Sequence, residues 1–83
     1  GSGVDTITSD ADFTIVTTAT EKRIKSNGGI QVANMTAAAT SSNVGSIRYR
    51  TAVAGLIGVS YVDMVMQTGL ATYEWVNIVQ NSW

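Results

Sequence analysis

The chain of 83 residues contains no cysteine and no histidine. The lack of cysteine excludes disulfides and thiolate metal sites, and the lack of histidine removes the commonest metal ligand and general base. A chain this short that folds alone buries only about 60% of the surface of its unfolded form, so its stability is marginal. Small folds usually compensate with disulfides, a metal ion or association of subunits. Association is therefore the expected remedy.

Charged residues are also scarce, at 13% of the chain with a net charge of −1. We therefore expect no nucleic-acid partner, and the small basic cluster Lys22-Arg23-Lys25 is interpreted as a solvated strand face. No apolar run approaches the roughly 18 residues of a membrane-spanning helix, so no membrane insertion is expected. Hydrophobic residues form 45% of the chain, which is too apolar for a disordered protein. Its many β-branched residues favour strands.

The pattern of residues 61–79 predicts a β-hairpin. If Thr68-Gly69 is a two-residue turn, both arms alternate apolar and polar side chains, and the glycine supplies the positive φ that such turns favour. On the polar face of this hairpin, Asp63 would then lie directly across from Glu74, and two like charges in such a pair repel each other. The predicted core or trimer-contact face consists of Val62, Met64, Met66, Tyr73 and Trp75.

Residues 45–50 predict a further strand, with Ile47 and Tyr49 turned inward. Arg48 and Arg50 would lie on its outer face, beside the two carboxylates of the hairpin, and neutralise them. Ion pairs at an exposed surface contribute well under ~1 kcal/mol, so these would fix register more than they would stabilise. The predicted register-setting charges are Arg48, Arg50, Asp63 and Glu74.

The N-terminal half predicts strands as well. Residues 13–18 alternate apolar and hydroxyl side chains, and the charges of residues 20–26 suit the edge of a sheet. Asn27-Gly28-Gly29 has the composition of a tight turn, and residues 30–35 form the return strand. We therefore predict a strand and a hairpin in this half of the chain.

These predictions divide one domain into parts. Residues 1–3 are interpreted as a remnant of expression cloning. Residues 4–36 hold the N-terminal strand and hairpin, and residues 37–44 form a connector of small side chains. Residues 45–83 form a three-stranded antiparallel meander with a charged outer face. Within it, residues 51–60 fit a strand, a loop or an interfacial plug, and the sequence leaves these alternatives open.

Two segments resemble a known family. Residues 12–34 combine a strand with Glu21, Arg23 and Ile24, then Ser26-Asn27-Gly28 and an alternating strand that carries Ile30 and Val32. This order is similar to a repeat of bacteriophage tail and virion fibres. A second fibre pattern is matched by Gly45-Ser46-Ile47-Arg48-Tyr49 and later by Trp75-Val76-Asn77-Ile78. Locally, Glu74-Trp75-Val76 also resembles the foldon hairpin of phage fibritin.

The resemblance implies a homotrimeric, all-β part of a phage fibre, with chains intertwined or side by side. Such a domain would belong to the virion, would be extracellular after release, and would trimerise the fibre. It would also present a tip that binds a host-surface glycan or protein receptor. Residues 51–60 depart from the family, whose loop is shorter and more polar, and this favours their burial along a trimer axis.

No group of residues predicts catalysis, so we expect neither an enzyme nor a cofactor or metal site. Aromatic rings stack on sugar faces, and the candidates for ligand contact at a tip are Tyr61 and Trp83. Two alternatives to a receptor-binding fibre domain stay open. One is a monomeric carbohydrate-binding module with an exposed aromatic stripe, and the other is a purely architectural, foldon-like trimerisation unit.

Overall fold

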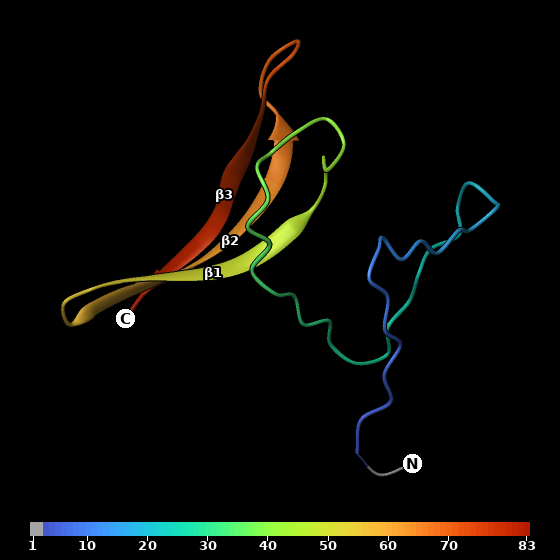
Figure 1. Ribbon diagram of the computed structural model, residues 1–83, viewed down its shortest axis with the longest axis horizontal. Helices are drawn as coiled ribbons and strands as arrows, with labels where there is room; N and C mark the ends of the chain where they lie inside the picture. Colours follow the sequence, from blue (N-terminus) through green and yellow to red (C-terminus); the bar gives the residue numbers. More distant parts are fainter. Residues whose placement is uncertain (1–2) are drawn as a thin grey trace.

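The computed structural model describes residues 3–83, so the first two residues of the predicted cloning remnant lie outside it. The described chain is all-β and contains no helix. Its strands are β1 (Ile47–Ala54), β2 (Ile57–Gln67) and β3 (Tyr73–Ser82). They form one antiparallel sheet in the order β1-β2-β3 (Figure 1). This confirms the predicted all-β meander.

The stretch left open by the sequence forms the hairpin between β1 and β2. Ala54 pairs with Ile57, so Gly55 and Leu56 alone make the turn. Gly55 has a φ of 64°, whereas Leu56 has a negative φ. Positive φ at only the first central position is the pattern of a type II′ turn, whose twist matches that of the flanking strands. Residues 51–60 are therefore strand ends and a turn.

The connection between β2 and β3 differs from the prediction. Gln67 pairs with Tyr73, so the loop contains five residues, 68–72, and Gly69 has no positive φ. The Thr68 amide donates to the Thr72 carbonyl at 2.9 Å, and their hydroxyls lie 3.2 Å apart. These bonds close a longer loop, and the predicted two-residue turn is wrong.

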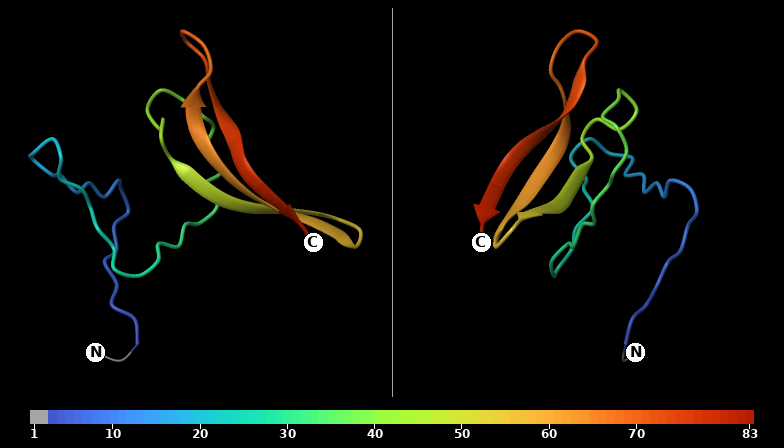
Figure 2. Two further views of the ribbon diagram at one scale, coloured as in Figure 1. Left: turned by 180° about the vertical axis from the view of Figure 1, so that it is seen from behind. Right: turned by 60° about the vertical axis from the view of Figure 1, so that its left-hand side comes forward.

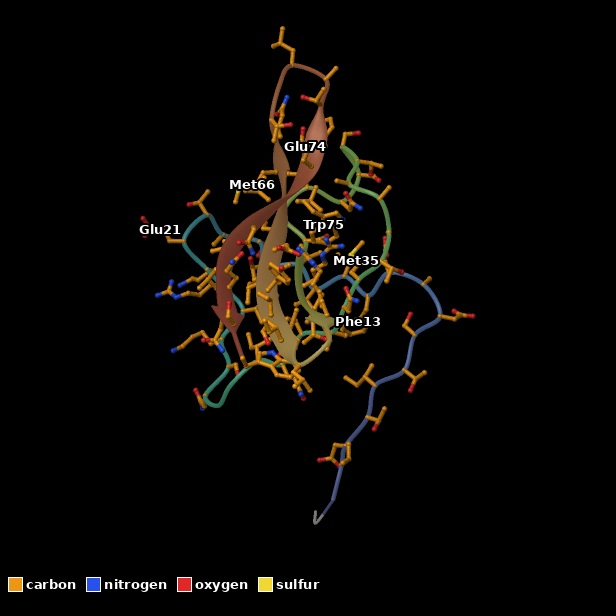
Figure 3. The ribbon with its side chains drawn as sticks, turned by 90° about the vertical axis from the view of Figure 1, so that its left-hand side faces the viewer. Phe13, Glu21, Met35, Met66, Glu74 and Trp75 are labelled. Atoms are coloured by element: carbon orange, nitrogen blue, oxygen red, sulfur yellow. The ribbon has the colours of Figure 1, made fainter. Side chains whose placement is uncertain are left out.

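The longer loop changes which face each side chain of β3 occupies. It shifts the pairing by three positions, and any odd shift moves a strand's side chains to the other face. Val65 now pairs with Trp75, and Met66 pairs with Glu74. Tyr73 and Trp75 were predicted to share a face with the methionines, and both predictions are therefore wrong. Figure 3 shows Met66 and Trp75 on opposite sides of the sheet.

Residues 3–46 contain no strand in the single chain, so the predicted N-terminal strands and hairpin do not form within it. Within residues 3–32, the backbone–backbone hydrogen bond is that of Lys22 with Ala19, at 3.2 Å. Neither Gly28 nor Gly29 adopts positive φ, so the chain bends at residues 27–28 without the conformation expected of the predicted hairpin turn. An extended segment needs a neighbouring strand to bind its amides and carbonyls, and the single chain offers none here.

We call residues 33–46 the strap, because they run along β1 and over one face of the sheet (Figures 1 and 2). The strap includes the predicted connector, residues 37–44. At its start, the Tyr49 amide donates to the Ala33 carbonyl at 3.3 Å. At its end, the Val65 amide donates to the Ser46 carbonyl at 3.0 Å, which prolongs the pairing of β1 with β2. Both ends are thus fixed to the sheet.

The single chain is too open for a compact monomer. Its radius of gyration is 16.1 Å, whereas a compact domain of this length has about 12 Å. It exposes 7164 Å², against about 4,700 Å² for a compact monomer of 8.7 kDa. Among the described residues, Val65 is the one hydrophobic side chain that is fully buried, and Asp63 is the one polar counterpart. The chain alone therefore has almost no core.

Candidate functional site: an open apolar face supported by a buried charge cluster

The two faces of the sheet differ in chemistry. The charged face carries, on its three strands, Arg48, Arg50, Tyr61, Asp63, Val65, Trp75 and Asn77. The apolar face carries Ile47, Tyr49, Val62, Met64, Met66, Val76, Val79 and Trp83. The predicted inward positions of Ile47 and Tyr49 beside Val62, Met64 and Met66 are thus confirmed.

Asp63 is the centre of the charged face and is only 1% exposed. Its Oδ2 accepts from Arg48 Nε at 2.9 Å and from Arg50 Nε at 2.6 Å. Its Oδ1 accepts from Asn77 Nδ2 at 3.1 Å. Both carboxylate oxygens therefore have donors, as a buried charge requires.

The protonation state of Asp63 follows from these contacts. Burial raises the pKa of the carboxyl, but hydrogen bonds from Arg50, Arg48 and Asn77 lower it by more. The resulting pKa lies below the ordinary value of 3.8. Asp63 therefore stays ionised at neutral pH, where its single negative charge is shared between the two arginines.

Each arginine also stacks on an aromatic ring. The Arg48 guanidinium lies 3.9 Å from the centre of the Trp75 ring, and that of Arg50 lies 3.9 Å from the centre of the Tyr61 ring. Such cation–π contacts contribute about 0.5–2 kcal/mol each, more when water is excluded. The rings and the carboxylate together hold both guanidinium groups in fixed positions.

The strap closes over this cluster. Trp75 Nε1 donates to the Ala37 carbonyl at 2.9 Å, and Arg48 Nη1 donates to the Met35 carbonyl at 3.2 Å. Figure 3 shows Met35 and Trp75 on the same side of the sheet. The charged face is thus internally satisfied, because its donors and acceptors bind one another or the strap.

The predicted charges are partly confirmed. Arg48 and Arg50 do neutralise Asp63, as expected from their places in the meander. The expectation for Glu74 is wrong, because the register places it on the other face, opposite Met66. The predicted solvent-exposed pairing is also wrong, since Asp63 is buried. Breaking such a buried pair costs about 3–5 kcal/mol, far more than an exposed one.

The apolar face, in contrast, is open. Ile47 is 42% exposed and Val79 is 56% exposed. At its β3 side, the bulge opposite Val62 and Asp63 brings Val79 beside Val62. A contiguous apolar surface of this kind is typical of an interface rather than of a free surface.

Trp83 closes one end of the apolar face. Its backbone exchanges two 2.7 Å hydrogen bonds with Gly58, and its ring lies directly against that glycine, where a Cβ would overlap it. Its Nε1 donates to Ser60 Oγ at 3.2 Å, and Tyr49 Oη lies 2.9 Å from the same oxygen. The other candidate for ligand contact, Tyr61, lies on the charged face. The two therefore do not form one aromatic site.

Several residues of this arrangement were missed by sequence reasoning. Asn77 and Val65 lie at the heart of the charged face, and Val76 and Val79 lie on the apolar face. The three β3 residues, Asn77, Val76 and Val79, depend on the pairing of β2 with β3, whereas Val65 shares a face with Asp63 through the alternation of β2. A search for a polar partner of Asp63 on β3 would have favoured Asn77 over Glu74 and so the observed register.

Among residues 3–83, no three acidic side chains gather in a position to bind a metal ion. The same residues include no helix that is long and apolar enough to cross a membrane. No protein-family model, curated protein or solved structure matches the chain.

Proposed function

We propose that the chain is a subunit of a homotrimeric β fibre, in which the apolar faces of three sheets meet around a threefold axis. One observation carries this proposal. The charged face is satisfied within the chain, whereas the apolar face, including Ile47 and Val79, is left open. A sheet must cover its apolar face with another layer, and identical subunits supply that layer through closed symmetry.

The exposed area supports an obligate assembly. The chain exposes about 2,400 Å² more than a compact monomer of its mass would. Interfaces of permanent oligomers bury roughly 2,000–5,000 Å² in total and resemble a domain core that has been cut in half. The missing core of this chain is therefore of the size that subunit contacts provide.

The fibre assignment itself rests on the resemblance of residues 12–34 and of the later Ile47-Arg48-Tyr49 and Trp75-Val76-Asn77 segments to phage fibres. On this proposal the domain lies in a virion fibre, holds three chains together and stands near the tip that attaches to the host. Trp83 is the aromatic side chain best placed for receptor contact, because it is 59% exposed at one end of the sheet.

A purely architectural role is the second candidate, and the arginine stacks favour it. Tyr61 and Trp75 are half-buried and each has one ring face covered by a guanidinium group, which leaves less of either ring for a sugar. The same contacts weaken the alternative of a monomeric carbohydrate-binding module, which needs a continuous exposed stripe. Absence of host-cell binding by the isolated trimer would select the architectural role over the receptor-binding one.

The trimer is tested with two neighbouring substitutions on β3. Val79 lies on the apolar face and Gln80 on the other, and both are exposed in the single chain. We expect the unmodified protein to have three times the chain mass of 8.7 kDa in light scattering. Val79→Lys should dissociate it, because a buried charge is costly, and Gln80→Lys should not. A monodisperse monomer for the unmodified chain refutes the proposal.

A further inference from the structure

The outer edge of β3 is unpaired. The strand order places β3 at one side of the sheet. Within the described chain, residues 73–82 make no backbone–backbone hydrogen bonds other than those of the β2–β3 ladder. Ten residues of extended strand span about 33 Å. An edge of this length, with free amides and carbonyls, is a template for another strand.

The opposite edge of the sheet, along β1, is already in use. The Ala33 carbonyl accepts from the Tyr49 amide. Residues 30–32 line a hollow with Tyr49 and Val62 at the β1 side of the apolar face. The chain's own segment thus binds the β1 edge at Tyr49, whereas the β3 edge has no partner along its whole length within the described chain.

Residues 13–18 have the chemistry of a strand but no partner. Phe13, Ile15 and Thr17 alternate with Thr14, Val16 and Thr18. In the described chain none of these six residues makes a hydrogen bond. Their apolar side chains are also exposed, with Phe13 at 62% and Val16 at 74%. The sequence contains no proline, so every amide of the segment can join a ladder. Six residues span about 20 Å, which fits along β3.

The segment lies on the wrong side of its own sheet to reach β3. Residues 12–14 line an open hollow with strap residues, including Met35 and Ala37. Both views in Figure 2 show the N-terminal half beyond β1, with the sheet between it and the outer edge of β3. The vacant edge within reach of this segment therefore belongs to another copy of the chain.

We infer that residues 13–18 of one copy pair with the open edge of β3 in a neighbouring copy, and that Phe13 and Ile15 thereby extend its apolar face past Val76 and Val79. This inference rests on the proposed trimer and names one of its contacts. The contact is head to tail, because the donor segment leaves from the β1 side and the acceptor edge is β3. A head-to-tail contact whose rotation is 120° closes into a threefold ring, which is the symmetry of the proposed trimer.

The pairing is tested by amide hydrogen exchange on the full-length assembled protein. We expect the amides of residues 13–18 to exchange at least about 100-fold more slowly than in an unstructured peptide, because strand pairing protects them. Trimers mixed from isotope-labelled and unlabelled chains should give inter-chain nuclear Overhauser contacts between this segment and β3.

Proline variants supply the matched control. Adjacent amides of a strand point to opposite edges, so Ile15→Pro or Val16→Pro must remove a ladder bond. One of the two should abolish the protection of residues 13–18, whereas Ile7→Pro, which lies before this segment, should leave it unchanged.

Each outcome decides between the proposals. A trimer whose residues 13–18 exchange at unprotected rates overturns the strand addition and leaves the proposed function standing. Contacts to β3 found only within one chain overturn the exchange between copies. A monomer overturns both.

Discussion

Replacing Asp63 by asparagine is the most direct test of how the sheet is held together. Asp63 is 1% exposed and accepts from Arg48, Arg50 and Asn77. An asparagine at this position would keep the volume but lose the charge, so the two guanidinium groups would remain beside a neutral amide. The side chain of Arg48 is only 15% exposed, so water compensates it poorly.

The magnitude follows from the cost of an unpaired buried charge. Removal of one partner of such a pair destabilises by about 3–5 kcal/mol. Whole domains are stable by only about 5–15 kcal/mol, so the Asp63→Asn variant should lose at least about a fifth of its stability. For a small protein this corresponds to a fall of about 2 M in the midpoint of urea unfolding.

The assay is urea unfolding followed by tryptophan fluorescence, at one fixed protein concentration because the stability of an oligomer depends on it. Asp10→Asn is the matched control. It makes the same chemical change at an exposed carboxylate outside the sheet that forms no salt bridge within the described residues. Its effect should stay within about 0.5 kcal/mol. If Asp63→Asn unfolds at the same urea concentration as Asp10→Asn, the charge cluster does not stabilise the sheet.

Three further predictions concern pH and two glycines. The folded-state pKa of Asp63 lies below its ordinary value of 3.8, so the ionised carboxylate stabilises the fold above that pH, and this stabilisation is lost as the pH falls through the folded-state pKa. The free energy of unfolding should therefore decrease below about pH 4. In the Asp63→Asn variant, most of this pH dependence of stability should be absent. Gly58→Ala places a methyl group in the ring of Trp83 and should expose this tryptophan, seen as a red shift of its emission; an unchanged spectrum would contradict the packing. Gly55→Ala should cost about 1 kcal/mol in urea unfolding because of its positive φ, whereas Gly28→Ala, at a negative φ in open space, should cost less.

The sequence predicted the elements of the C-terminal half better than their connections. The alternation around Arg48 and Tyr49 and along Val62 to Met66 identifies two strands and their faces, because burial of one face leaves a period of two. The loops were harder to assign. Gly69 has the composition of a hairpin turn, but Gly55 supplies the positive φ. The chain turns at both positions, but composition does not state how many residues each turn contains, and the pairing of the strands sets two residues at the first and five at the second.

The N-terminal half shows a different limit. Residues 13–18 and 30–35 carry a strand pattern, yet the single chain leaves them without a ladder. A pattern of alternation states that a segment fits beside another strand, but it does not state in which chain that strand lies. The candidate interface was likewise predicted only in part. The sequence identified Val62, Met64 and Met66, but the β3 side of the face depended on the register.

The charge cluster explains why this register, and not the shorter one, is adopted. With a two-residue turn, Asp63 would face Glu74, and two like charges opposite each other are destabilising. In the observed register Asp63 faces Asn77, which donates a hydrogen bond to it. Glu74 lies on the other face of the sheet, opposite Met66. A slip of β3 by one residue would exchange its two faces, and a slip by two residues would keep the faces but change every pair. Either slip separates Asn77 from Asp63. A buried carboxylate thus selects the pairing that brings Val76 and Val79 to the apolar face, and in this way it determines the surface that a neighbouring chain meets.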